Sequence, residues 1–287
     1  MTNKLRQYFP MIHTRQEVLA EIEAKPKLKQ EFYSWGKKYR KEFLDFCTGV
    51  KGVKIMYDFI SKEILNPETV PERVEELLSL LIGQQVHIKE VLPNDGTRIS
   101  DESTLVIMDM VVELEDGSIV NLEVQKIGYK FPGARSACYS ADLLLRQYKK
   151  VRSKKGKKFN YTDVKDVYTI VLFEKSPTEF HEFPDTYIHY FEQHSNTGIQ
   201  LNLLQKYLFI SIDIFLKYQQ NIGIQLETRR DAWLAFMGSD DPDIILKVIE
   251  KYPGSEEARL AMRDLKSIYV DLNRIDEFAA LANAMPG

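Results

Sequence analysis

The spacing of apolar residues predicts helices at both ends of the chain and a mixed α/β region between them. Up to residue 48, apolar side chains recur at helical intervals among charged residues, and from residue 226 onward the pattern is helical again. Between these regions the expected order is helix 54–65, helix 71–83, strand 86–92, strand 104–114, strand 118–125, helix 134–152, strand 166–174 and strand 206–215. This order predicts three parts: an N-terminal helical arm at 1–53, an α/β domain at 54–215 and a C-terminal helical region at 216–287.

The strongest local signal is a hairpin between residues 104 and 125. The apolar run TLVIMDMVVEL leads into Glu115-Asp116-Gly117, and the run SIVNLEVQ follows. Asp-Gly between two such runs is typical of a hairpin turn. Two acids, Asp109 and Glu123, interrupt the apolar pattern of these strands. Because burying an ionised carboxylate without a partner is costly, each acid requires a partner.

The length of the turn decides whether these two acids meet. A two-residue turn sets Asp109 opposite Val124 and sends Asp109 and Glu123 to opposite faces of the sheet. A three-residue turn at 115–117, with Gly117 in the left-handed conformation, sets Asp109 directly opposite Glu123. Their Cβ atoms would then lie roughly 5 Å apart on one face.

Two carboxylates at that separation repel each other unless a cation lies between them. Hard oxygen ligands of this kind suit Mg²⁺ or Mn²⁺, which retain several waters and also bind phosphate oxygens. The alternative is a structural role for each acid, paired with Arg135 or Lys126. The spacing alone leaves both interpretations open.

Three segments resemble a known family of nucleases. They are YDFISKEIL at 57–65, VIMDMVVELEDGSIVNLEVQ at 106–125 and ARSACYSADLLLRQY at 134–148. Together they resemble the PD-(D/E)XK nuclease superfamily, and more narrowly its transposase family, which includes the Rpn recombination-promoting nucleases. The resemblance covers about 54–215. It implies a restriction-endonuclease-like αβββαβ core and a Mg²⁺- or Mn²⁺-dependent endodeoxyribonuclease that hydrolyses phosphodiester bonds in DNA.

The resemblance also implies roles for individual residues. Asp109 and Glu123 would bind the metal, with the backbone carbonyl of Val124 as a further ligand. Gln125 stands where the superfamily has a lysine. Glutamine orients water by hydrogen bonds but adds no charge, and it is typical at this place of the transposase group.

A helical glutamate before the hairpin often joins the site in this superfamily. The candidates are Glu63, Glu75 and Glu76. Glu76 ranks first because its helix immediately precedes the sheet. The alternative for each is a solvated surface acid.

A basic segment follows the hairpin. Residues 146–158 read RQYKKVRSKKGKK, with eight Lys or Arg and no acid. We expect phosphate contacts from this segment and from the helix before it, and the candidates are Arg135, Tyr139, Arg146, Lys149, Lys150, Arg152, Lys154, Lys155, Lys157 and Lys158. That helix is expected to bury Ala134, Ala137, Ala141 and Leu144 and to present Arg135, Tyr139 and Arg146 on one polar face. The alternative is a solvated charge run.

Composition narrows the function classes. The chain has 287 residues and a formal net charge of −3, which argues against indiscriminate coating of nucleic acid. Its two cysteines form no zinc motif, and no signal peptide or apolar run of membrane-spanning length is seen. We therefore expect a cytoplasmic protein without structural zinc.

Two other functions fit the same residues. One is a catalytically silent descendant that binds DNA or a protein, and the other is a nuclease toxin or phage-defence effector. In each case the helical region 216–287 is a candidate for homo-oligomerisation or partner binding.

Overall fold

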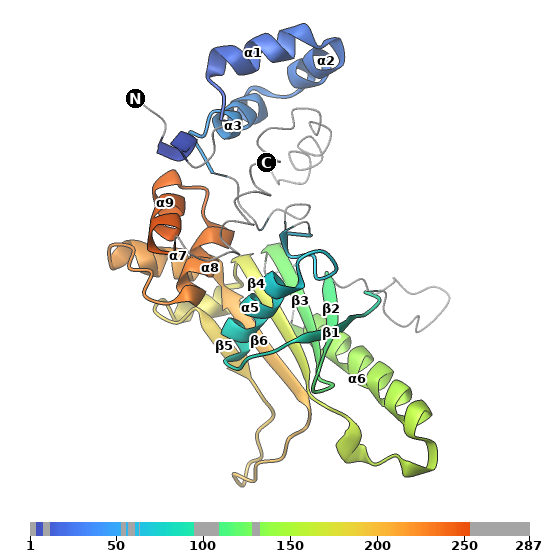
Figure 1. Ribbon diagram of the computed structural model, residues 1–287. Coiled ribbons are helices and arrows are strands. Elements are labelled where there is room, and N and C mark those ends of the chain that lie inside the picture. The colour runs from blue at the N-terminus through green and yellow to red at the C-terminus, as the bar shows by residue number, and fades with distance from the viewer. Residues whose placement is uncertain are drawn as a thin grey trace. The chain divides into compact units, whose positions relative to one another are not determined.

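The computed structural model describes residues 4–7, 12–52, 56, 61–62, 64–94, 109–127 and 133–252 (Figure 1). Contacts divide the chain into two compact units, one of Met1–Ile64 with Leu226–Gly287 and the other of Leu65–Gln225. These two boundaries differ from the domain boundaries predicted from the sequence, at residues 53 and 215. The predicted division into three parts remains a proposal. The N-terminal and C-terminal helices share one unit.

A six-stranded mixed sheet forms the centre of the unit Leu65–Gln225. Its strands are β1 (Ile88–Val91), β2 (Met110–Leu114), β3 (Ile119–Ile127), β4 (Val167–Lys175), β5 (Ile188–Phe191) and β6 (Gln205–Ser211), in the spatial order β1-β2-β3-β4-β6-β5. The pairs β3/β4 and β4/β6 are parallel, whereas β1/β2, β2/β3 and β5/β6 are antiparallel. β4 is buried along most of its length, as expected for a strand with parallel neighbours on both sides.

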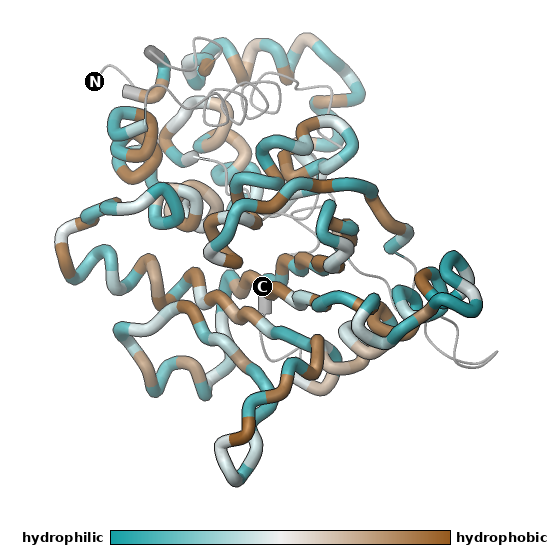
Figure 2. The backbone as a smooth tube through the Cα atoms, turned by 60° about the horizontal axis from the view of Figure 1, so that its bottom comes forward, coloured by the Kyte–Doolittle hydropathy of each residue, from teal (hydrophilic) through white to brown (hydrophobic). Residues whose placement is uncertain are grey.

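Helices α5 (Pro71–Ile82), α6 (Gly133–Lys155) and α7 (Ile212–Asn221) complete this unit, together with the short turns η3 (Gly156–Lys158), η4 (Tyr161–Asp163) and η5 (Thr178–Glu182). The order α5-β1-β2-β3-α6-β4 is αβββαβ, so the predicted core is confirmed. α5 begins with Pro71 and ends at Gly83, whose φ of 83° provides the left-handed cap. Figure 2 shows hydrophobic and hydrophilic stretches alternating along the chain, as elements with one buried side require.

The buried face of α6 differs from the prediction. Ala134, Ala137 and Ala141 are exposed, and the buried residues of α6 are Ser136, Tyr139, Ser140, Leu143 and Gln147. Tyr139 and Leu143 join a cluster with Val111, Ile119, Val167, Val171 and Phe173 of the sheet. Leu144 of the predicted apolar side does pack against this cluster. The three alanines were wrongly predicted because burying a tyrosine and a leucine removes more apolar surface from water than burying alanines does.

The end of the last predicted strand is also different. β6 stops at Ser211, and Ile212 begins α7, so only part of 206–215 is extended. Ile212, Phe215 and Gln219 are buried at helical spacing. The segment IDIF alternates apolar and polar residues only briefly, and such a short run fits a strand or a helix. β5 was not predicted.

The other unit contains η1 (Lys4–Gln7), α1 (Arg15–Ala24), α2 (Pro26–Ser34), α3 (Lys37–Cys47), α8 (Arg229–Gly238) and α9 (Pro242–Lys251). Its N-terminal helices pack through a core of Val18, Ile22, Leu28, Phe32, Phe43, Leu44 and Cys47. The helices expected at both ends are thus present where the structure describes them. Most of the expected helix 54–65 and the tail beyond residue 252 lie outside the described residues. No described helix combines the length and the apolar character that crossing a membrane requires.

Candidate metal centre on the β2–β3 hairpin

The turn between β2 and β3 has three residues, as the sequence predicted. The N–H of Leu114 donates to the carbonyl of Ser118 at 2.8 Å, and the N–H of Gly117 donates to the carbonyl of Leu114 at 2.9 Å. Gly117 has a φ of 89°, a left-handed conformation that favours glycine. The next pairs along the hairpin include Met110 with Leu122. Extending this register by one residue sets Asp109 opposite Glu123.

Hydrogen bonds across the end of the hairpin hold the two acids together. The N–H of Val124 donates to Oδ2 of Asp109 at 2.8 Å. The N–H of Asp109 donates to Oε1 of Glu123 at 3.3 Å. Asp109 lies just before the first residue of β2, where the antiparallel ladder ends. Each carboxylate is therefore oriented by the backbone of the opposite strand.

The environment of Glu123 strongly favours its protonated form. Glu123 is 1% exposed. Burial raises the pKa of Glu123, and the negative charge of Asp109 raises it further, to about 8. The amide of Asn121, the backbone N–H of Asp109 and the charge of Arg135 act in the opposite direction but are weaker. Near neutral pH the pair therefore holds a proton that a cation could displace.

The donor set fits a small, hard divalent cation. Two carboxylates with room for waters and phosphate oxygens are what Mg²⁺ and Mn²⁺ accept. In a β-strand, the N–H and the carbonyl of any one residue point toward the same neighbouring strand. Because the N–H of Val124 points toward Asp109, the carbonyl of Val124 points to that side as well. Gln125 is half-buried and shares a sheet face with Glu123.

Arg135 and Tyr139 of α6 lie beside the carboxylates. Nε of Arg135 donates to Oη of Tyr139 at 2.6 Å, and the guanidinium lies over the ring, 5.1 Å from its centroid. Burial raises the pKa of Tyr139, and the charges of Glu123 and Asp109 add to this effect. Tyr139 is buried, so its predicted place on a polar face was wrong. A positive charge does lie near the two acids, as expected.

The helical glutamates differ in their surroundings. Glu63 lies outside the described residues. Glu75 accepts from the N–H of Ile88 at 2.6 Å and contacts Nδ1 of His87 at 3.1 Å, so it fixes the start of β1. Glu76 is half-buried on α5, and its role as a ligand remains a prediction. Among the described residues, no three His, Cys, Asp or Glu side chains are placed to hold a metal ion together.

Several cations of the basic segment 146–158 form ion pairs with nearby acids. Nζ of Lys150 lies 2.8 Å from Glu113 and 2.7 Å from Glu90, and Nε of Arg146 lies 2.9 Å from Asp142. Lys155 pairs with Asp163, and Arg152 contacts Tyr148. The remaining candidates are exposed and make no ion pair with another described residue: Lys149, Lys154, Lys157 and Lys158. Their contacts with phosphate remain a prediction.

Asn121 was not anticipated from the sequence. It is fully buried on β3, two residues before Glu123, and it favours the ionised form of that acid. The available signal was its position, because an amide two residues from an acid lies on the same face of a strand.

An αβββαβ core with a mixed sheet is the fold of the restriction-endonuclease class of nucleases, and this chain has that nuclease-type fold. More narrowly, the chain belongs to the PD-(D/E)XK nuclease family transposases, because the model of that family matches residues 55–273. The match extends beyond residue 215, the predicted end of the α/β domain. Comparison with curated proteins and with solved structures finds no match.

Proposed function

We propose that this protein is a divalent-metal-dependent DNA endonuclease whose metal is held by Asp109 and Glu123. The observation that carries the proposal is the pair itself. Two acids from opposite strands share one site, and the pKa of Glu123 is raised to about 8 partly by the charge of Asp109. Such a site favours a cation or a proton between the carboxylates. Membership of the nuclease family makes DNA the natural substrate.

The residues around the pair have separable tasks in this proposal. Asp109, Glu123 and the carbonyl of Val124 would hold Mg²⁺ or Mn²⁺. When bound, such a metal lowers the pKa of a water and polarises the scissile phosphate. Gln125 orients the attacking water by hydrogen bonds. Arg135 offsets the negative charge of the site and the incoming phosphate.

The exposed lysines provide the wider DNA contacts. Lys149, Lys154, Lys157 and Lys158 lie on α6 and on the turn that follows it. Their charges neutralise phosphates without reading sequence. The protein is thus proposed to act on DNA in the cytoplasm, with the C-terminal helices available for self-association.

Cleavage of supercoiled plasmid tests this function. We expect nicked and linear products with Mg²⁺ or Mn²⁺ and none with EDTA. DNA binding without cleavage in either metal would contradict the proposal. It would favour a catalytically silent descendant that keeps the fold and binds DNA.

A further inference from the structure

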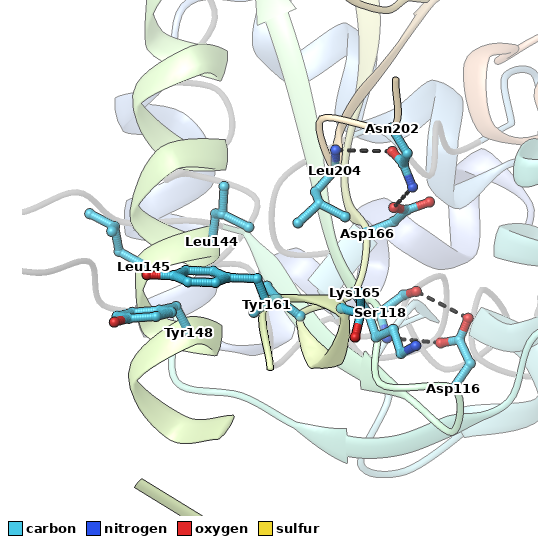
Figure 3. Close-up of a pocket in the computed structure, with 12 residues that line it drawn as sticks. Asp116, Ser118, Leu144, Leu145, Tyr148, Tyr161, Lys165, Asp166, Asn202 and Leu204 are labelled. Atoms are coloured by element: carbon cyan, nitrogen blue, oxygen red, sulfur yellow. Dashed lines mark hydrogen bonds between the residues drawn. The ribbon is translucent and has the colours of Figure 1, made fainter. Parts of the chain in front are cut away.

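A groove at the turn end of the β2–β3 hairpin lies apart from the two acids. Leu144, Leu145 and Tyr148 of α6 form one wall, Tyr161 follows, and Asp166 and Asn202 lie on the far side (Figure 3). We call the groove formed by these six residues the tyrosine groove. Its volume is about 830 Å³, and it is open to solvent.

The aromatic wall of the tyrosine groove is already arranged for stacking. The rings of Tyr148 and Tyr161 are nearly parallel, at 10°, with centroids 6.0 Å apart. Phe159 supports both rings edge-on, at 5.5 Å from Tyr148 and 5.3 Å from Tyr161. Yet Tyr161 is 72% exposed. A ring that is held in place and still faces water offers a surface on which another flat group can stack.

Positive charge lies on the elements that carry this wall. The guanidinium of Arg152 lies over the ring of Tyr148, 5.6 Å from its centroid. Lys154, Lys157 and Lys158 are exposed in the last turn of α6 and in η3. An aromatic surface beside clustered cations matches a flat base linked to a phosphate chain.

The opposite wall carries two acids, Asp116 and Asp166, and one cation, Lys165. Oδ1 of Asp166 accepts a hydrogen bond from Nδ2 of Asn202 at 2.7 Å. Carboxylates repel phosphates but accept hydrogen bonds from the amino groups of bases. The charge of the groove therefore sets a direction, with the phosphates toward the lysines and the base edge toward Asp166.

We propose that the tyrosine groove binds an unpaired segment of DNA, with a base stacked on Tyr161 and its phosphates against Arg152 and the neighbouring lysines. The inference rests on the proposed function, in which DNA is the substrate. A duplex does not fit this surface in the same way, because its bases already stack on one another and expose only their edges.

The groove and the two acids lie along the same elements. Ser118, which also lines the groove, directly precedes β3 and is five residues from Glu123, which is roughly 17 Å in extended chain. On α6, Tyr139 and Tyr148 are nine residues apart, which is roughly 14 Å in a helix. At the roughly 3.4 Å per nucleotide of a stacked strand, four or five nucleotides cover this separation, and a more extended unpaired strand needs fewer. One DNA molecule can therefore occupy both sites.

Binding of labelled oligonucleotides to the full chain in EDTA tests the inference, because EDTA removes metal-dependent cleavage from the measurement. By fluorescence anisotropy, Tyr161→Ala should weaken binding of single-stranded oligothymidine roughly five- to 150-fold, the range for loss of one stacked base. Tyr161→Trp should retain binding, and binding of a duplex of equal length should not change. Tyr190→Ala is the matched control, since Tyr190 is 61% exposed on β5 and lies outside the groove.

Three results would overturn the inference. The first is unchanged single-strand binding by Tyr161→Ala, and the second is an equal loss with Tyr190→Ala. The third is a shift to a smaller species in sedimentation with Tyr161→Ala and an equal loss of single-strand and duplex binding, which would assign the groove to a second copy of this chain. Selective loss of single-strand binding by a protein that cleaves no plasmid would support the groove and contradict only the proposed nuclease activity.

Discussion

Asp109→Asn is expected to lower the rate of metal-dependent DNA cleavage by about a thousandfold or more. The amide oxygen can still accept the hydrogen bond from the N–H of Val124, so the end of the hairpin keeps its geometry. The negative charge is lost, and with it much of the affinity for the metal. A bound metal contributes several kcal/mol to the transition state, and each 1.36 kcal/mol is tenfold in rate. Single-turnover nicking of a supercoiled plasmid measures the effect.

The matched control for this variant is Glu115→Gln. Glu115 belongs to the turn of the same hairpin and is exposed, so its substitution removes an equal charge away from the site. We expect nicking at the wild-type rate. If Asp109→Asn and Glu115→Gln cleave equally well, Asp109 does not hold the metal.

Glu123 should make the metal-free protein less stable as the pH rises from 5 to 8. Burial and the charge of Asp109 raise the pKa of Glu123 to about 8, against an ordinary value of 4.5. Between these values the folded chain keeps a proton that the unfolded chain has released. The free energy of unfolding therefore falls by up to about 1.4 kcal/mol per pH unit and levels off above pH 8.

Urea unfolding in EDTA across this pH range checks the prediction. Glu123→Gln should remove the downward slope, because glutamine has no proton to release. With Mn²⁺ in place of EDTA the slope of the wild type should be smaller, since Mn²⁺ binds the folded state at the site of the proton. A wild-type slope that persists in Glu123→Gln would show that another group is responsible.

Glu113→Gln is the contrasting control on the neighbouring strand. Burial raises the pKa of Glu113, but hydrogen bonds from Lys150 and Lys89 outweigh it and hold the pKa below its ordinary value. Glu113 therefore stabilises the fold above its unfolded pKa, and this contribution is lost as the pH falls. Its substitution should leave the slope between pH 5 and 8 in place.

The register of the hairpin was predictable because it depends on neighbouring residues. Asp116-Gly117 marks the turn, Gly117 adopts the left-handed conformation, and the count along each strand then sets Asp109 opposite Glu123. The αβββαβ order was also predictable, because it follows from the spacing of apolar residues along the sequence. Turn chemistry and period are local properties, and a single sequence carries both.

The tertiary environment of α6 was not predictable from local pattern. Small residues occupy several sides of this helix, so composition does not identify the buried face. Packing on the sheet selected the side with Tyr139 and Leu143. The same contacts bury Tyr139 next to Glu123 and give Arg135 its place. The two residues that connect the helix to the acids therefore became clear only in three dimensions.

The tyrosine groove was likewise not predictable from local sequence pattern. Tyr148 belongs to α6, Tyr161 to η4, and Asn202 to the chain before β6. In the sequence Tyr148 lies within the basic segment 146–158 and Tyr161 follows it. Nothing in the sequence indicates that their rings stack. The candidate DNA contacts of this region therefore extend from lysines to aromatic rings.

Titration of the full chain with Mn²⁺, followed by the electron paramagnetic resonance of the unbound ion, measures directly whether Asp109 and Glu123 hold one metal together. The wild type should take up Mn²⁺, and Asp109→Asn and Glu123→Gln should each lose that uptake. The double variant should lose no more than either single variant, because both residues serve one site. Uptake of Mn²⁺ at wild-type affinity by both single variants would contradict the metal centre and the nuclease mechanism built on it.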